Sequence, residues 1–239
     1  MQLFYSKDIT TGGLCSLDTE ESRHAVRVLR LREGDELHVT DGRGHLFRCR
    51  IVTADERACS VETLECSEPQ GDRPRLHLAV APTKNPSRME WLVEKAVEMG
   101  VGSITLLQSD HSERVFMKTD RLERLAVSAM KQSLHLTLPE ITAPTPLRDW
   151  LLNSKLLTPN SQLKFIAHCE ADKPRTSLTE ALKLGADAVV LIGPEGDFSA
   201  DEIALALQQG FLPVSFGDAR LRTETAALYA VAAFNFINN

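Results

Sequence analysis

Two short segments combine glycines with charged side chains, a pattern typical of loops that bind a ligand. The first is Gly193-Pro194-Glu195-Gly196-Asp197, which lies between a wholly apolar segment and a helix start. The second runs from Phe216 to Ala226 and includes Arg222 and Glu224 just before an apolar helix. Glycine lets a backbone come close to a ligand, and proline stiffens the turn. Backbone donors and charged side chains therefore converge in both segments.

Each of these loops follows an expected strand of a parallel sheet. In open parallel sheets, ligands bind beyond the carboxyl ends of the strands, so the two loops together predict a binding site. A purely structural role stays open for both loops, because strand-to-helix turns routinely contain glycine whether or not a ligand is present.

Several common active-site motifs are absent from the sequence. It contains no G-x-x-x-x-G-K-[ST], G-x-G-x-x-G, H-E-x-x-H or G-x-S-x-G. These absences argue against P-loop nucleotide hydrolysis, an ordinary dinucleotide site, a zincin mechanism and a hydrolase nucleophile elbow. The seven histidines have no metal-ligand spacing, and the five cysteines contain no C-x-x-C pair. We therefore expect no metal site and no disulfide framework, with the cysteines as small packed thiols.

Length and composition are those of a globular chain. The 239 residues allow one large domain or two modest ones, and 43% of them are hydrophobic and 25% charged. The longest apolar run, Ala226 to Phe234, is far too short for a membrane span, and the N-terminal residues lack the pattern of a signal peptide. We expect a soluble, cytoplasmic protein with no membrane partner.

The charge balance restricts how the chain can bind a polyanion. With 27 basic and 33 acidic residues the formal net charge is −6, so any such site must be a local patch. Residues 23–32 include four arginines and no acid, and Arg23, Arg27 and Arg30 fall at i, i+4 and i+7 of an expected helix. We predict that these three arginines hold phosphates. The open alternative is a solvated helix face paired with Glu20, Glu33 and Glu36.

The first seventy residues predict a small β domain. Short alternating strands are expected at 36–40, 45–53 and 58–64, and one helix begins after Asp18 and ends at Gly34. Several short strands and one helix favour a small β-barrel or sandwich over residues 1–70. Ser67 to Arg75 is polar and includes two prolines and a glycine, which makes it the predicted domain boundary.

Residues 74–239 predict an α/β domain. Strands are expected at 76–81, 103–108, 163–168, 188–192 and 214–216. Capping boxes at Ser87, Ser177 and Ser199 predict three helices between these strands, and further helices are expected at 120–134 and from Thr223. The strand at 188–192 is wholly apolar, as is typical of strands buried in parallel sheets. The pattern favours helices on both faces of a mainly parallel sheet.

Six groups of residues occur in a specific order along the chain. They are His24…Val28-Leu29-Arg30-Leu31…Gly34-Asp35, Lys84…Arg88-Met89-Glu90…Glu94-Lys95-Ala96…Glu98-Met99-Gly100-Val101, Ser112-Glu113-Arg114, Ala129…Gln132-Ser133…Leu138-Pro139-Glu140-Ile141, Ile192-Gly193-Pro194-Glu195-Gly196 and Gly217…Arg220-Leu221-Arg222-Thr223-Glu224-Thr225-Ala226. In this order they resemble the RsmE family of 16S ribosomal RNA (uracil-N3) methyltransferases, members of the knotted SPOUT superfamily.

The resemblance implies a PUA-like RNA-binding domain followed by a SPOUT-type α/β methyltransferase domain with a trefoil knot, an exception to the near absence of knots in proteins. It also implies S-adenosylmethionine as cofactor, a homodimer with its site near the interface, and a uridine of 16S rRNA in the 30S subunit, near the decoding centre, as target. Against the cofactor it places Leu191, Ile192, Gly193, Pro194, Gly196, Phe216, Gly217, Leu221, His168 and Glu170. Arg88 and Arg114, within the shared motifs, are predicted to join Arg23, Arg27 and Arg30 in binding RNA.

Methylation of uracil N3 requires removal of the N3 proton and stabilisation of the charge that develops on the ring. We predict Glu195 or Glu224 as the base or as the group that orients it, and Arg222 as the electrostatic partner. A structural role is open for both acids, since Glu224 can favour a helix N-terminus and Glu195 can bond amides of its own loop.

Two positions depart from the family pattern, in which a second glycine usually stands at 197 and an arginine at 135. This chain has Asp197 and His135 instead. The departure at His135 motivates an alternative function, a non-catalytic RNA-binding or ribosome-assembly factor with the same fold. A cofactor-dependent enzyme of small molecules is a third hypothesis, which would leave the arginines unused.

Overall fold

The computed structural model describes residues 2–69, 73–113, 117–153, 163–170 and 174–238. Its contacts divide the chain into two compact units: Met1–Asp72 with Val127–Leu138, and Arg73–Ala126 with Pro139–Asn239. Each unit has its own β-sheet. Within the described ranges, no helix combines the length and the apolar character that a membrane span requires.

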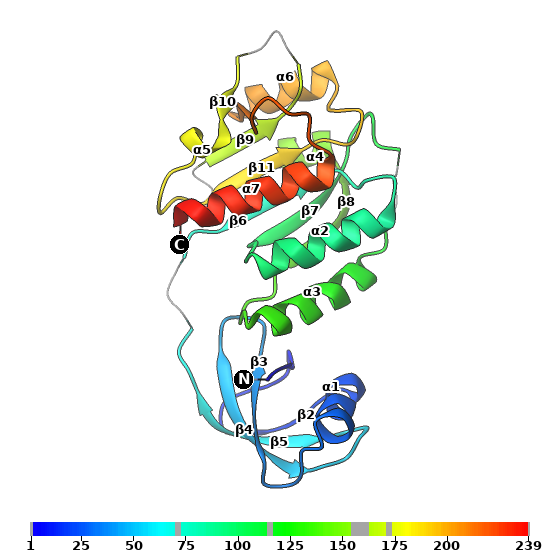
Figure 1. The fold of residues 1–239 in the computed structure, drawn as a ribbon, viewed down its shortest axis with the longest axis vertical. Coiled ribbons are helices and arrows are strands. Elements are labelled where there is room, and N and C mark those ends of the chain that lie inside the picture. The colour runs from blue at the N-terminus through cyan, green and yellow to red at the C-terminus, as the bar shows by residue number, and fades with distance from the viewer. Residues whose placement is uncertain (1, 70–72, 114–116, 154–162, 171–173, 239) are drawn as a thin grey trace. The chain divides into compact units, whose positions relative to one another are not determined.

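The first unit is built on one five-stranded sheet. Its strands are β1 (Leu3–Tyr5), β2 (Leu14–Ser16), β3 (Glu36–Thr40), β4 (Leu46–Thr53) and β5 (Ser60–Cys66). They lie in the order β1-β3-β4-β5-β2, antiparallel except for the pair β1 and β3 (Figure 1). The predicted alternation in β4 is confirmed, because Phe47, Cys49 and Ile51 enter the core. The edge strands β1 and β2 escaped prediction because three residues are too few to show a period.

The predicted helix of this unit is shorter than its sequence pattern indicates. Helix α1 (Thr19–Arg23) begins at Asp18, whose side chain accepts a hydrogen bond from Glu21 N, and continues as one π-helical turn, η1 (His24–Val28). The helix therefore ends well before Gly34. Arg30 follows with a left-handed φ of +58°. The predicted single stripe of Arg23, Arg27 and Arg30 is wrong, because a π turn changes the spacing and Arg30 lies beyond the helix.

Residues 127–138 complete the first unit from a distant part of the chain. They include the last turns of α3 (Thr119–Ser133), where Lys131 forms an ion pair with buried Glu21. Burial raises the pKa of Glu21, and its second oxygen has no hydrogen-bond partner within the described residues. Leu136 O also accepts hydrogen bonds from Thr40 Oγ1 and Gly44 N, each at 3.0 Å. The segment is thus held to the β-sheet by both charge and backbone pairing.

The second unit contains a fully parallel seven-stranded sheet. Its strands are β6 (Leu76–Val80), β7 (Ser103–Gln108), β8 (Glu140–Pro146), β9 (Leu163–Ala167), β10 (Thr176–Ser177), β11 (Ala188–Ile192) and β12 (Leu212–Ser215), in the order β10-β12-β9-β11-β6-β7-β8. The predicted strands at β7 and β11 agree at both ends. Strand β8 was missed because its two prolines oppose a strand prediction, although prolines are tolerated at a sheet edge.

Helices cover both faces of this sheet, as predicted. Its helices are α2 (Pro86–Glu98), the first part of α3, α4 (Leu147–Leu152), α5 (Leu178–Ala181), α6 (Ala200–Gln208) and α7 (Thr223–Asn238). Helices α2 and α7 pack together, and α7 lies against β6 and β11 (Figure 1). On the opposite face, Trp150 of α4 and Ile203 of α6 pack in one core with Val189 and Leu191 of β11.

One of the three predicted capping boxes forms. At Ser199, the side chain accepts from Glu202 N and the Glu202 side chain accepts from Ser199 N. The prediction at Ser87 is wrong, because Asn85 caps α2 two residues earlier and accepts from Ser87 N. Ser177 precedes a helix but makes no side-chain cap, and its hydroxyl bonds that of Thr179 instead.

A buried histidine lies in the core of the second unit. His77 on β6 bonds Ser103 Oγ at 2.7 Å and Thr105 Oγ1 at 3.0 Å, and its ring stacks on Trp150 with 5.7 Å between centroids. Burial lowers the pKa of His77 to about 4. The folded state therefore favours the neutral ring.

This histidine makes the stability of the protein fall in mild acid. Because its pKa is lower in the folded state than in the unfolded one, its contribution is complete above pH 6.5 and is lost as the pH falls toward 4. We expect the free energy of unfolding to drop by about 2–3 kcal/mol from this group between pH 7.5 and 4.5. Urea unfolding of wild type and of His77→Gln measures it. An identical pH dependence in the two proteins would contradict the assignment to His77.

Candidate functional site

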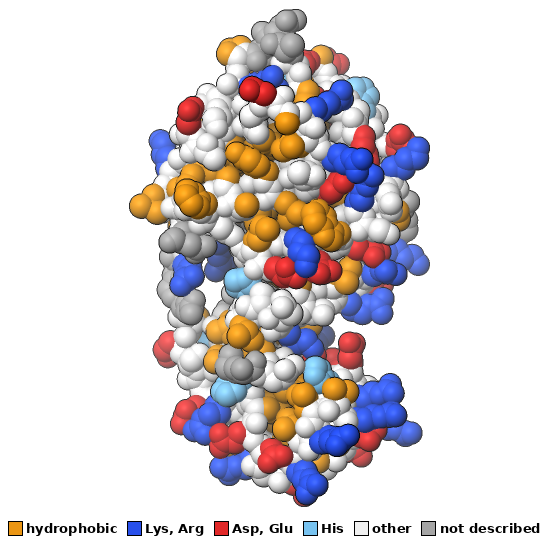
Figure 2. Space-filling model, viewed as in Figure 1, with side chains coloured by type: hydrophobic (Ala, Val, Ile, Leu, Met, Phe, Trp, Pro, Cys, Tyr) orange, Lys and Arg blue, Asp and Glu red, His pale blue; other side chains and the backbone are white. Residues whose placement is uncertain are grey.

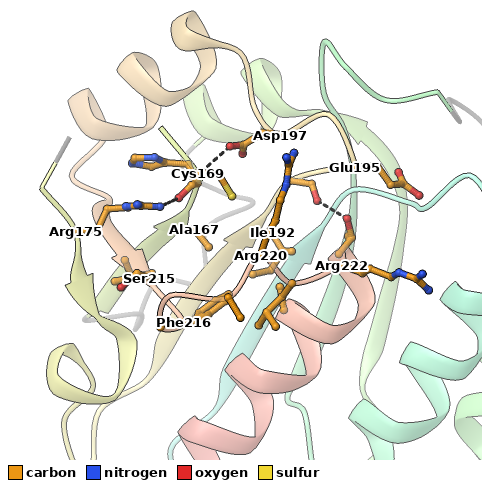
Figure 3. Close-up of a pocket in the computed structure, with 18 of the residues that line it drawn as sticks. Ala167, Cys169, Arg175, Ile192, Glu195, Asp197, Ser215, Phe216, Arg220 and Arg222 are labelled. Carbon is orange, nitrogen blue, oxygen red and sulfur yellow. Dashed lines mark hydrogen bonds between the residues drawn. The ribbon is translucent and has the colours of Figure 1, made fainter. Parts of the chain in front are cut away.

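A pocket of about 340 Å³ lies at the carboxyl ends of β9, β11 and β12 (Figure 3). Three segments line it: the end of β9 through Cys169, the loop after β11, and the loop between β12 and α7. In parallel sheets, ligands bind to the loops at this edge of the sheet. The two glycine-containing loops singled out in the sequence thus meet at one cavity.

The inner part of the pocket is apolar. Ile192, Val214, Phe216, Leu221 and Ala226 line it, and the Phe216 ring packs against that of Tyr229 with 5.1 Å between centroids. Backbone groups of Gly193 and Gly217 border the same space. Such a lining suits a flat, partly apolar ligand that is oriented by a few polar contacts.

Seven of the ten predicted cofactor residues line this pocket: Ile192, Gly193, Pro194, Phe216, Gly217, Leu221 and His168. Three do not. Leu191 is buried in the core on the other face of β11, and Gly196 packs against His111, where an added Cβ would lie 3.1 Å from that of the histidine. Glu170 is half-buried and outside the lining.

The loop after β11 is hydrogen-bonded to the segments that follow β6 and β7 and to the start of α7. Lys84 N, after β6, donates to Glu195 Oε1 at 3.1 Å, and Thr223 Oγ1, at the start of α7, donates to Gly193 O at 3.0 Å. His111 Nδ1, after β7, lies 3.2 Å from Gly196 O and 3.0 Å from Asp197 O, so its N–H donates to both. Gly193 has no room for a side chain, since an added Cβ would lie 3.2 Å from Phe198 N.

The predicted catalytic residues divide into two groups. Glu195 and Arg222 line the pocket, and Figure 3 shows both side chains extending to the same side, away from Cys169 and Arg175. Glu224 is buried outside the lining, and its Oε1 lies 3.6 Å from Arg88 Nε on α2. Within the described residues its Oε2 has no hydrogen-bond partner. Glu224 is thus placed to hold Arg88.

The predicted RNA-binding arginines of the first unit are exposed. Arg23, Arg27 and Arg30 form no ion pair within the described part of the chain. The alternative of a paired helix face loses support, because Glu36 pairs with Arg48, which also pairs with Glu65. Arg114 lies outside the described residues.

Sequence reasoning missed Arg175 as a residue of the pocket, whereas Cys169 lies in the segment His168 to Glu170 that the resemblance placed against the cofactor. Arg175 lines the pocket and donates from Nη1 to His168 O, and Cys169 is an exposed free thiol on its wall. Arg220 lines it from the loop before α7. No local signal marks Arg175, because it reaches the pocket through the pairing of β10 with β12.

Comparison with known proteins now adds to this geometry. Residues 71–235 match the family described as "RNA methyltransferase domain", and residues 17–64 match "RNA methyltransferase PUA domain". The ribosomal RNA small subunit methyltransferase E of Aquifex aeolicus is 31% identical over 97% of this chain and 98% of that protein.

Two solved structures are similar over nearly their whole length. A structure described as a probable rRNA-methyltransferase from Porphyromonas gingivalis has a TM-score of 0.90 and 42% identity, covering 100% of this chain and 98% of that one. The ribosomal RNA small subunit methyltransferase E of Neisseria gonorrhoeae, bound to S-adenosyl methionine, has a TM-score of 0.81 and 27% identity, with coverage of 100% and 98%.

Fold and pocket together define an RNA methyltransferase of the SPOUT type with a PUA-like N-terminal domain, and the predicted fold class is confirmed. The chain belongs to the ribosomal RNA small subunit methyltransferase E family, as the order of its motifs indicated.

Proposed function

We propose that this protein transfers a methyl group from S-adenosylmethionine to N3 of a uridine in the 16S rRNA of the small ribosomal subunit, near the decoding centre. The pocket at the ends of β9, β11 and β12 carries the proposal, because the two loops of the family motifs form it together. The relatives named for small-subunit rRNA, and the relative bound to S-adenosyl methionine, support this substrate and cofactor. An rRNA substrate also supports a cytoplasmic location.

The residues of the pocket fit the cofactor. Its apolar part, with Ile192, Phe216 and Leu221, suits the adenine ring, and the backbone of Gly193 and Gly217 supplies polar groups at its border. When bound, the cofactor supplies an electrophilic methyl group. The chain must then hold uracil N3 in line with that methyl at near-attack distance.

Glu195 is the group that we assign to the N3 proton. It lines the pocket and is exposed, so a base inserted from solvent can reach it, whereas Glu224 is buried. The hydrogen bond from Lys84 N to its Oε1 fixes the direction of the carboxylate. Arg222, exposed on the same side, stabilises the negative charge that develops on the uracil oxygens. Glu224 acts through Arg88 and positions it toward the RNA.

Exposed arginines support RNA binding by the first unit. Arg23, Arg27 and Arg30 sit beside exposed Val28 and Leu29, so cationic and apolar groups share one surface. Guanidinium groups without protein partners are free to pair with phosphates, and unstacked bases favour apolar surfaces.

A flipped or single-stranded uridine is the form that the pocket requires.

An exposed apolar face supports the homodimer. Figure 2 shows hydrophobic side chains gathered over α7 and α2. Helix α2 exposes Trp91, Met99 directly after α2 is exposed too, and α7 exposes Tyr229 and Phe236, the last of them by 89%. Apolar clusters of this kind on two packed helices favour association with another copy. The Phe216 ring packs against that of Tyr229 in a tilted arrangement, which connects this face to the pocket.

The reaction itself is the direct test of the function. We expect labelled methyl to pass from S-adenosylmethionine to unmodified 30S subunits or 16S rRNA, and nuclease digestion with mass spectrometry to identify 3-methyluridine. Binding of S-adenosylmethionine without any transfer would favour the assembly-factor alternative. Labelling of a different base would contradict the uracil assignment.

Variants of the three charged residues separate the proposed roles. Loss of a general base reduces rate by about 10²–10⁴-fold, so Glu195→Gln should slow single-turnover methylation by at least about 10². Glu224→Gln should instead weaken RNA binding with a smaller change in the chemical step, and Arg222→Gln should slow the chemical step. Calorimetry with S-adenosylmethionine checks that all variants keep the cofactor site. An unchanged rate for Glu195→Gln would remove it from the role of base.

Salt dependence tests the arginines of the first unit. Each phosphate contact contributes about 0.7–0.9 to the slope of log K against log salt concentration. We expect the variant with Arg23, Arg27 and Arg30 changed to glutamine to lose about two units of slope and much of its RNA affinity. Arg48→Gln is a matched control, because that cation is already paired with Glu36 and Glu65. Equal slopes in the triple variant and wild type would exclude phosphate contacts at these residues.

A further inference from the structure

Asp197 occupies a backbone position that side chains rarely adopt. Its φ is +64°, in the left-handed region where glycine is free and aspartate and asparagine are tolerated better than other residues. Its N–H donates to Pro194 O at 3.0 Å, and its carbonyl accepts from His111. Backbone geometry alone would favour glycine here, so the side chain must serve another purpose.

The Asp197 carboxylate joins two walls of the pocket. Oδ2 accepts a hydrogen bond from Cys169 N at 2.7 Å (Figure 3), and Oδ1 accepts one from Phe198 N at 2.8 Å. Cys169 follows β9, whereas Asp197 follows β11, and both residues line the pocket. The charge of the carboxylate strengthens both bonds. One side chain therefore links the two loops just beyond the paired ends of β9 and β11.

We propose that Asp197 is a positioning residue, which fixes the Cys169 wall of the cofactor pocket against the loop after β11 and thereby tunes affinity for S-adenosylmethionine. The inference rests on the proposed function. Cys169 is exposed, so water can take the place of the lost acceptor when the carboxylate is removed. Loss of the bond at Cys169 then costs the fold little, while the wall loses its fixed position.

This role predicts separate effects on stability and on binding. Glycine suits the left-handed backbone but removes the acceptor of Phe198 N, so Asp197→Gly should unfold close to the temperature of wild type. Its affinity for S-adenosylmethionine should nevertheless fall about tenfold, or about 1.4 kcal/mol. Asp197→Asn keeps the tolerance for positive φ and one acceptor oxygen for Cys169 N, so it should bind within about threefold of wild type.

The test combines three measurements. These are calorimetry with S-adenosylmethionine, thermal unfolding, and amide exchange at Cys169 in the ligand-free proteins. We expect exchange at Cys169 to accelerate in Asp197→Gly and to stay slow in Asp197→Asn. Steady-state methylation should show a raised KM for the cofactor in Asp197→Gly with kcat within about twofold of wild type.

Wild-type affinity in Asp197→Gly, or equally weak binding in both variants, would overturn the proposal. Failure of wild type to bind S-adenosylmethionine would contradict the proposed function instead. Amide exchange at Cys169 would still test the contact with Asp197 in that case, because it needs no ligand.

Discussion

Burial of β11 on both faces is the constraint on which the second unit depends. All five of its side chains are apolar and buried, between the α4 and α6 core on one face and α7 on the other, so no polar group can be placed along the strand. Polar groups first become possible where the strand ends at Gly193. The hydrogen bonds of the next five residues to the ends of β6, β7 and β9 and to α7 therefore do two things at once. They satisfy backbone groups at a crowded sheet edge, and they fix the walls of the pocket.

Prediction from sequence succeeded for several local signals, although the capping boxes expected at Ser87 and Ser177 do not form. The apolar run of β11, the capping box at Ser199 and the two glycine-containing loops depend on neighbouring residues, and all three are present as expected. Prediction failed where the position of a side chain depends on a residue that is far away in the sequence. The bond from Asp197 to Cys169 joins residues 28 positions apart, and Glu224 turned from the pocket because Arg88 of another helix lies beside it. The π turn at His24–Val28 was hidden because the same residues fit an α-helix equally well.

A net charge of −6 is compatible with an RNA substrate because several acidic side chains lie beside a basic partner, which weakens their field at short range. Arg48 with Glu36 and Glu65, Lys95 with Glu94 and Glu98, and Arg121 with Glu90 are ion pairs of exposed or partly exposed side chains. Such pairs contribute little to stability but cancel charge at short range. The electric field of the surrounding side chains is then weak, so an arginine without an acidic neighbour keeps its positive charge available to a phosphate. Selectivity for one structured RNA site over bulk polyanions follows from such sparse cations.

The first unit is built from two separate parts of the chain, and this affects how it folds during translation. All five strands of its sheet precede residue 72, yet Lys131 and Leu136 supply a counter-ion for Glu21 and an acceptor for Thr40. At about 5–20 residues per second, these partners emerge from the ribosome several seconds after the strands that need them. Until then an unpaired acid lies in a forming core. The N-terminal unit therefore completes these contacts only after the first strands of the second unit have been made.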